Sequence, residues 1–201
     1  PFSFRNWNIQ TKLTQFIFED LILLIAPYFQ NIKIVNHEIS SDSTSLYLLL
    51  FIILLISVIL RTTLQFTIFW KKNETKIVTT LKLILVYYIS FIMLRYGFDK
   101  IFKAQFYLPE PNTLFTPLGM LDKDILYWST MGTSHIYNIF MGLAEIIPAL
   151  MLLYRKTRSL GLYILAGVLL NVVFINLGFD ISVKLFSLFL LLAVLLLLAN
   201  S

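Results

Sequence analysis

The sequence predicts an all-α integral membrane protein, a bundle of four hydrophobic helices behind a more polar N-terminal segment. Of its 201 residues, 58% are hydrophobic and the mean hydropathy is +0.81, whereas soluble domains are about 45–50% apolar. The apolar residues form long runs, and about 20 such residues in a helix cross a hydrocarbon core of about 30 Å. Most of the 27 charged residues, 16 basic and 11 acidic, fall between these runs. The excess of apolar residues is therefore expected to face lipid.

Residues 1–43 are expected to form an extracytoplasmic or interfacial segment. Its apolar part, residues 16–28, is short for a span and contains Glu19 and Asp20, each of which would cost about 2.5–3.5 kcal/mol at the centre of a bilayer. We therefore predict an amphipathic helix at the interface. The chain begins with Pro1 rather than methionine, which is typical of a start within a longer protein. With four spans and residues 1–43 outside, any upstream residues are expected to cross the membrane, or an anchor to have been removed.

Residues 44–201 are predicted to form the membrane bundle. The first apolar segment is residues 45–61 and could continue to Trp70 as one helix, followed by a basic turn from Lys71 to Lys82. The later predicted spans are residues 79–102, 135–154, 160–178 and 184–199, which makes five apolar segments in all when 45–70 is included. The connection 103–134 contains three prolines and is long for a passive turn, so part of it is expected to fold over the bundle.

The charges of the connections predict the orientation. Basic residues dominate the 71–82 segment and the 155–158 turn, whereas 103–134 carries two basic and three acidic residues. Because cytoplasmic loops are enriched in Lys and Arg, the two basic segments are expected in the cytoplasm and residues 1–43 and 103–134 outside it. The predicted location is the bacterial inner membrane, crossed several times. The net charge of +5 is thus no sign of nucleic-acid binding.

Ionisable residues inside the spans are the candidate functional residues, because they are costly in lipid and usually turn inward and pair. They gather in the outer half of the bundle, beneath the 103–134 connection, which is typical of a pocket that opens outward. The candidates are Arg95, Asp99, Lys100, Glu145, Asn176, Asp180 and Lys184.

Spacing predicts which of these residues pair. Arg95 and Asp99 are i,i+4 neighbours, and Lys184 lies one short turn from Asp180. Arg95 and Glu145 lie about 10 and 15 Å from the outer ends of their helices, so we also predict an Arg95–Glu145 pair between helices.

A structural interpretation stands beside the functional one. Buried ion pairs can simply fix helix register, and small or polar residues such as Asn138, Gly142 and Ala149 commonly let helices approach. We favour the structural interpretation for these three and for Asp180 and Lys184. For Arg95, Asp99 and Glu145 both interpretations stay open.

Several chemistries have no support in the sequence. There is no cysteine, which excludes thiolate-held metals and thiol–disulfide chemistry in this chain. No phosphate loop, nucleophile elbow or metal-spaced set of His, Asp and Glu is recognisable. We therefore predict no metal.

Short motifs in the second half of the chain resemble the DoxX-like family of bacterial membrane proteins, in particular a subset common in Bacteroidota-type bacteria. The resemblance covers about residues 40–200 and is weakest before residue 80. The motifs are residues 95–100, 104–106, 131–132, 142–145 and 155–161, and most clearly Asn171-Val172-Val173, Asn176, Asp180, Val183-Lys184-Leu185 and Ser187.

The resemblance implies a membrane subunit of a quinone-linked oxidoreductase complex. Quinone would then be the cofactor, and Arg95, Glu145, Asn176 and Asp180 would meet its carbonyl or relay its protons. Without cysteine, electrons would have to come from a partner chain. The alternative, carried at similar weight, is a non-catalytic accessory or scaffold subunit of an envelope complex. A transporter is less favoured, since no inverted repeat is visible. The expected partners are the lipid bilayer and other membrane or envelope subunits.

Overall fold

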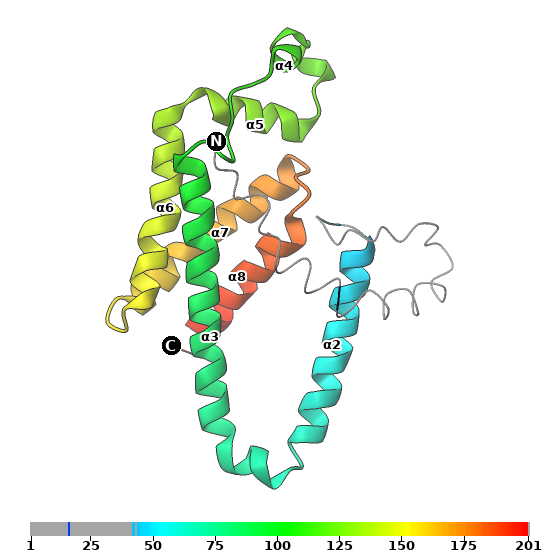
Figure 1. Cartoon of the computed structure of the whole chain (residues 1–201), viewed down its shortest axis with the longest axis vertical. Coiled ribbons are helices and arrows are strands. Elements are labelled where there is room, and N and C mark those ends of the chain that lie inside the picture. Colours follow the sequence, from blue (N-terminus) through cyan, green and yellow to red (C-terminus); the bar gives the residue numbers. More distant parts are fainter. Residues whose placement is uncertain (1–15, 17–41, 43, 201) are drawn as a thin grey trace. The chain divides into compact units, whose positions relative to one another are not determined.

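The computed structural model describes Phe16, Asp42 and residues 44–200, and every element between 44 and 200 is helical (Figure 1). This confirms the all-α prediction. The predicted amphipathic helix at residues 16–28 lies almost wholly outside the described residues. The elements are α2 (Thr44–Leu64), α3 (Ile68–Ile101), α4 (Pro111–Phe115), the 3₁₀ helix η3 (Leu118–Met120), α5 (Lys123–Thr133), α6 (His135–Leu153), α7 (Arg158–Gly178) and α8 (Lys184–Leu198).

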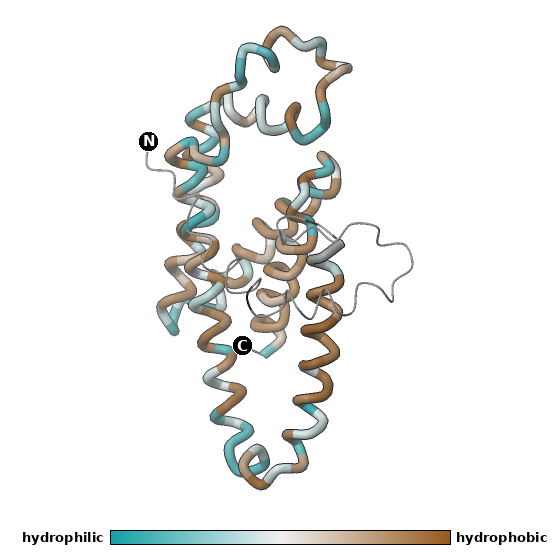
Figure 2. Tube along the Cα trace, turned by 45° about the vertical axis from the view of Figure 1, so that its right-hand side comes forward, coloured by the Kyte–Doolittle hydropathy of each residue, from teal (hydrophilic) through white to brown (hydrophobic). Residues whose placement is uncertain are grey.

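Four of these helices are long and apolar enough to cross a membrane: α2, α3, α6 and α7. Helix α8 is apolar throughout but has only 15 residues. The outward faces of the helices carry exposed Leu, Ile and Phe side chains, such as Phe174 and Leu192, and Figure 2 shows the same apolar character along the helices. The protein is therefore a multi-pass membrane protein.

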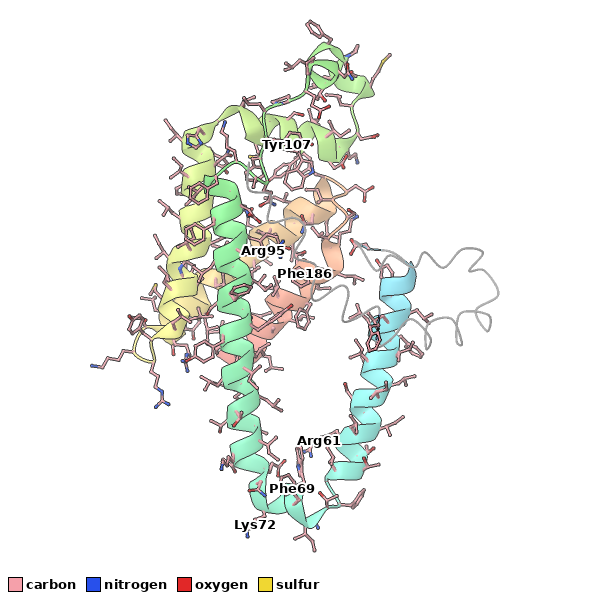
Figure 3. The ribbon with its side chains drawn as sticks, viewed as in Figure 1. Arg61, Phe69, Lys72, Arg95, Tyr107 and Phe186 are labelled. Carbon is pink, nitrogen blue, oxygen red and sulfur yellow. The ribbon has the colours of Figure 1, made fainter. Side chains whose placement is uncertain are left out.

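The chain divides into two compact units, residues 1–76 and 77–201. In the first unit, α2 ends at Leu64 and α3 begins at Ile68, so the first helix does not continue to Trp70. Residues 71–82, expected as a turn, are the beginning of α3. A cap starts the new helix, because Thr67 Oγ1 accepts the backbone N–H of Trp70. The Arg61 side chain then binds Glu74 at 3.1 Å and lies 4.8 Å from the Trp70 ring centroid (Figure 3).

The second unit is built around one apolar core shared by the later part of α3 with α6, α7 and α8. Helix α7 packs against both α6 and α8. The most buried core residues include Ile89 of α3, Ala149 of α6, Leu165 of α7 and Val194 of α8, each fully buried. The three predicted spans after residue 134 agree with α6, α7 and α8 to within two residues.

Residues 102–134, named the cap from here on, cover one end of this bundle. The chain leaves α3 through Lys103, whose φ of 56° is left-handed, and α5 then crosses the bundle end (Figure 1). Tyr127 of α5 and Phe106 pack with Ile181, which lies between α7 and α8. Part of the connection therefore does fold over the bundle, as the sequence predicts.

Candidate functional site

Two glycines set the distance between α3 and α6. A Cβ atom on Gly97 would lie 2.8 Å from the carbonyl oxygen of Gly142, and one on Gly142 would lie 2.6 Å from the carbonyl oxygen of Gly97. No real side chain fits at such distances. The absence of a side chain at both positions therefore lets the two backbones touch, as small residues do in membrane helix pairs.

This crossing brings together the two most deeply buried charges of the bundle. Lys100 follows Gly97 by three residues and Glu145 follows Gly142 by three. Helical side chains lean toward the N-terminus of their own helix, and α3 and α6 run in opposite directions (Figure 1). The two side chains therefore lean toward each other across the contact.

Lys100 and Glu145 form a buried ion pair between the two helices. Lys100 Nζ donates to both carboxylate oxygens, at 2.7 and 2.9 Å, and the side chains are only 7% and 2% exposed. The ammonium also lies 5.7 Å from the Tyr96 ring centroid and 5.9 Å from that of Phe106, within the range of cation–π attraction. The pair thus has its compensating partners in place, which a buried charge requires.

Aromatic side chains of the cap close over this pair. The Phe106 ring lies 5.5 Å from that of Trp128, and the Tyr127 ring lies 4.8 Å from that of Phe179, centroid to centroid. Burial in this cluster raises the pKa of Tyr127 to about 12, because the phenolate would lose its hydration. Through Phe106, this cluster lies beside Lys100, which is buried.

Hydrogen bonds and a close backbone contact hold the cap together and join it to α6. Lys103 Nζ donates to the Gly132 carbonyl at 3.3 Å, and a Cβ atom on Gly132 would collide with the Tyr107 carbonyl oxygen. Asn138 is fully buried. With its side-chain amide nitrogen facing the end of α5, it donates to the carbonyls of Met131 at 2.9 Å and Ser134 at 3.3 Å. Asn138 therefore joins α6 to the end of α5, in agreement with a structural role.

A second polar group joins α7 to α8. Asn176 Nδ2 donates to Ser187 Oγ at 3.0 Å, and that hydroxyl donates to the Lys184 carbonyl at 2.9 Å. Lys184 Nζ binds Asp180 at 2.6 Å, as predicted, with Asp180 78% exposed. Hydrogen bonding to Lys184 lowers the pKa of the Asp180 carboxyl. Asp180 also has a φ of 55°, where the chain turns between the two helices.

Arg95 does not pair with Glu145, which corrects the interhelical prediction. Arg95 Nε lies 3.9 Å from Asp99 Oδ2 on the same helix, and the two side chains are 46% and 28% exposed (Figure 3). At 100° per residue, Arg95 is about 140° around α3 from Lys100. It therefore lies on a different face of α3 from the Gly97 side that meets α6.

The seven predicted residues thus fall into three sets: Lys100 with Glu145, Asn176 with Asp180 and Lys184, and Arg95 with Asp99. Within the described residues, no group of three or more His, Asp or Glu side chains could hold a metal ion. The determinant that sequence reasoning missed is Gly97. Its spacing of three from Lys100, matching that of Gly142 from Glu145, is the signal that identifies the correct pair.

Comparison with known proteins adds little to this geometry. No protein family matches the chain, and no solved structure matches it. A stretch of 57 residues is 42% identical to the uncharacterized protein YwoB of Bacillus subtilis (strain 168), covering 28% of this chain and 37% of YwoB. The chain therefore matches just over a third of the length of this relative. The DoxX-like resemblance stays a prediction.

Proposed function

We propose that this chain is a non-catalytic accessory subunit of a bacterial envelope complex, set in the inner membrane with its cap outside the cytoplasm. The observation that carries the proposal is an apolar surface on the cap. Leu114, Phe115, Leu118 and Met120, named the tip, are 65%, 88%, 70% and 78% exposed. Large exposed apolar patches outside a membrane commonly mark interaction sites.

The position of the tip favours a protein partner over lipid. Figures 1 and 2 both show α4 and the turn after it beyond α5, on the side away from the bundle. With the spans across the bilayer, the tip is the part of this unit farthest from the hydrocarbon core. Exposed apolar side chains on the spans face lipid, whereas those of the tip need a protein partner to bury them.

The charges beside the tip define the partner further. Glu110 precedes α4, and Asp122 and Asp124 follow η3, against the single base Lys123. We therefore propose an extracytoplasmic protein domain whose apolar surface is bordered by Lys or Arg side chains. Such complementarity orients partners more than it adds affinity.

The buried ion pair supports a non-catalytic role. Lys100 occupies both oxygens of Glu145, and aromatic rings cover it. A proton relay needs a path to a neighbouring acceptor, whereas this arrangement joins α3 to α6. The ion pair therefore acts as a structural contact between these two helices.

Comparative purification tests the proposal. The full chain is extracted gently from native membranes beside a variant with all four tip residues changed to Ser, and co-purifying proteins are quantified by mass spectrometry. We expect one envelope protein in near-stoichiometric amount with the wild type and at least about tenfold less with the variant. Asn112→Ser with Thr113→Ser, also in α4, is the matched control and should retain the partner.

Two outcomes would overturn the docking surface. One is equal recovery of the same partner with the tip variant and with the wild type. The other is quenching of a fluorophore at position 115 by a lipid-soluble quencher in vesicles, which would place the tip in the bilayer.

A quinone-linked oxidoreductase subunit is the second candidate, favoured by Arg95 and Asp99. Arg95 lies six residues before the end of α3, about 9 Å along the helix, and this half-exposed pair would be costly against lipid alone. A quinone headgroup would offer it a polar partner. This candidate predicts quinone in the extract, less quinone with Arg95→Gln, and loss of turnover with Glu145→Gln. An extract without quinone would contradict this second candidate.

A further inference from the structure

An open groove lies at the opposite end of the bundle from the cap, where α6 ends and α7 begins. It has a volume of about 630 Å³. Ile147, Leu150, Met151 and Tyr154 form its apolar wall along α6, and Arg155 and Lys156 lie at its end. Three of the wall residues, Ile147, Leu150 and Tyr154, are 52%, 47% and 72% exposed.

The turn that carries the two cations is held in place by its neighbours. Thr157 Oγ1 donates to the Met151 carbonyl at 2.8 Å, and Arg158 Nε donates to the Leu152 carbonyl at 2.9 Å. A Cβ atom on Gly161 would lie 3.0 Å from the Pro148 carbonyl oxygen, so α7 starts in close contact with α6. Thr157 and Arg158 are thus engaged with α6, and the turn presents Arg155 and Lys156 outward.

The charged residues of the α6–α7 turn all have one sign. The sequence contains no Asp or Glu between Glu145 and Asp180, so no acid of α6 beyond Glu145 or of α7 opposes the two cations. Both side chains are exposed. The groove therefore combines an apolar wall along α6 with two cations in the turn that follows this helix.

From this combination we propose that the groove binds an anionic glycerophospholipid, with an acyl chain along Ile147 and Leu150 and the phosphate between Arg155 and Lys156. Basic pockets between membrane helices on the cytoplasmic side are known to bind anionic headgroups. A free phosphate or nucleotide would leave the apolar wall unused. A zwitterionic lipid would fill the wall but gain less from the cations.

Native mass spectrometry of the full chain in detergent tests the proposal with two probes of equal acyl chains, phosphatidylglycerol and phosphatidylcholine. We expect the wild type to retain phosphatidylglycerol preferentially. Arg155→Gln with Lys156→Gln should reduce that preference about tenfold, given the attraction of each cation to an anionic surface. Lys71→Gln with Lys72→Gln removes the same charge from the other basic segment and should leave the preference unchanged.

A groove variant separates the two halves of the site. Leu150→Trp fills the wall and should lower the retention of both lipids, whereas the charge variant lowers that of phosphatidylglycerol alone. Equal loss in the two charge variants would overturn the proposal, because the preference would then follow net charge. Retention of inorganic phosphate as strong as that of phosphatidylglycerol would also overturn it, because the site would then recognise the anion without its acyl chain. Circular dichroism of each variant confirms that its helices are intact.

Discussion

At the scale of single residues, the bundle depends on which charge meets Glu145. Sequence reasoning correctly identified Glu145 as a paired acid but chose Arg95, because depth along the helix was matched without the angle around it. Lys100 is the second-last residue of α3. Its long side chain nevertheless reaches back along the helix to the Glu145 carboxylate. Arg95 lies on another face and binds Asp99 instead.

Removing Lys100 should leave a buried acid without its partner. We expect Lys100→Met to destabilise the protein by about 3–5 kcal/mol, the usual cost of breaking a buried ion pair from one side. Lys100→Met combined with Glu145→Leu should recover most of this loss, because no charge is then left unpaired. Unfolding in mixed micelles measures both, with Lys123→Met on the exposed cap as the control. Equal stability of the single variant and the wild type would show that the pair does not hold the helices.

At the scale of elements, helix bounds were predicted well wherever charge and apolar runs alternate sharply. The ends of α6, α7 and α8 fall within two residues of their predicted positions. The sequence does not predict the beginning of α3, because a run of lysines in an apolar chain is typical of a turn between spans. Lysines are good helix formers, and the break occurs at Gln65–Thr67, where the sequence has neither Gly nor Pro to mark it.

Because the backbones of α3 and α6 are in contact, adding one methyl group between them should destabilise the protein strongly. In Gly142→Ala, the new Cβ atom would lie 2.6 Å from both the Gly97 carbonyl oxygen and Ile101 Cγ1. The helices must separate, and overpacking of this kind costs about 1–3 kcal/mol. Gly167→Ala on α7 is the matched control, because its Cβ atom would meet nothing within 4 Å and alanine favours a helix. Unfolding in micelles should rank the control at or above the wild type and Gly142→Ala below it, and the reverse order would refute a backbone contact.

At the scale of the whole molecule, composition was enough to predict an all-helical membrane protein, but not the way its cap is attached. The cap depends on contacts between residues far apart in sequence, such as Phe106 with Trp128 and Tyr127 with Phe179. Aromatic residues in a proline-containing connection have no periodicity that could predict these contacts. The sequence therefore placed the candidate residues beneath the cap but could not show that the aromatic cluster covers them.

The attachment of the cap should weaken at high pH through Tyr127. Its pKa in the folded protein is raised to about 12, above about 10 for an unfolded chain, so folding favours the neutral phenol. The stability that Tyr127 contributes is complete below pH 10 and is lost as pH rises from 10 through 12. Melting followed by circular dichroism should therefore show a fall in Tm across this window that Tyr127→Phe reduces. Tyr163→Phe, at a side chain 66% exposed on α7, should leave the fall unchanged. An equal fall in all three proteins would mean that the alkaline loss of stability comes from other groups and that the aromatic cluster of the cap does not depend on a neutral Tyr127.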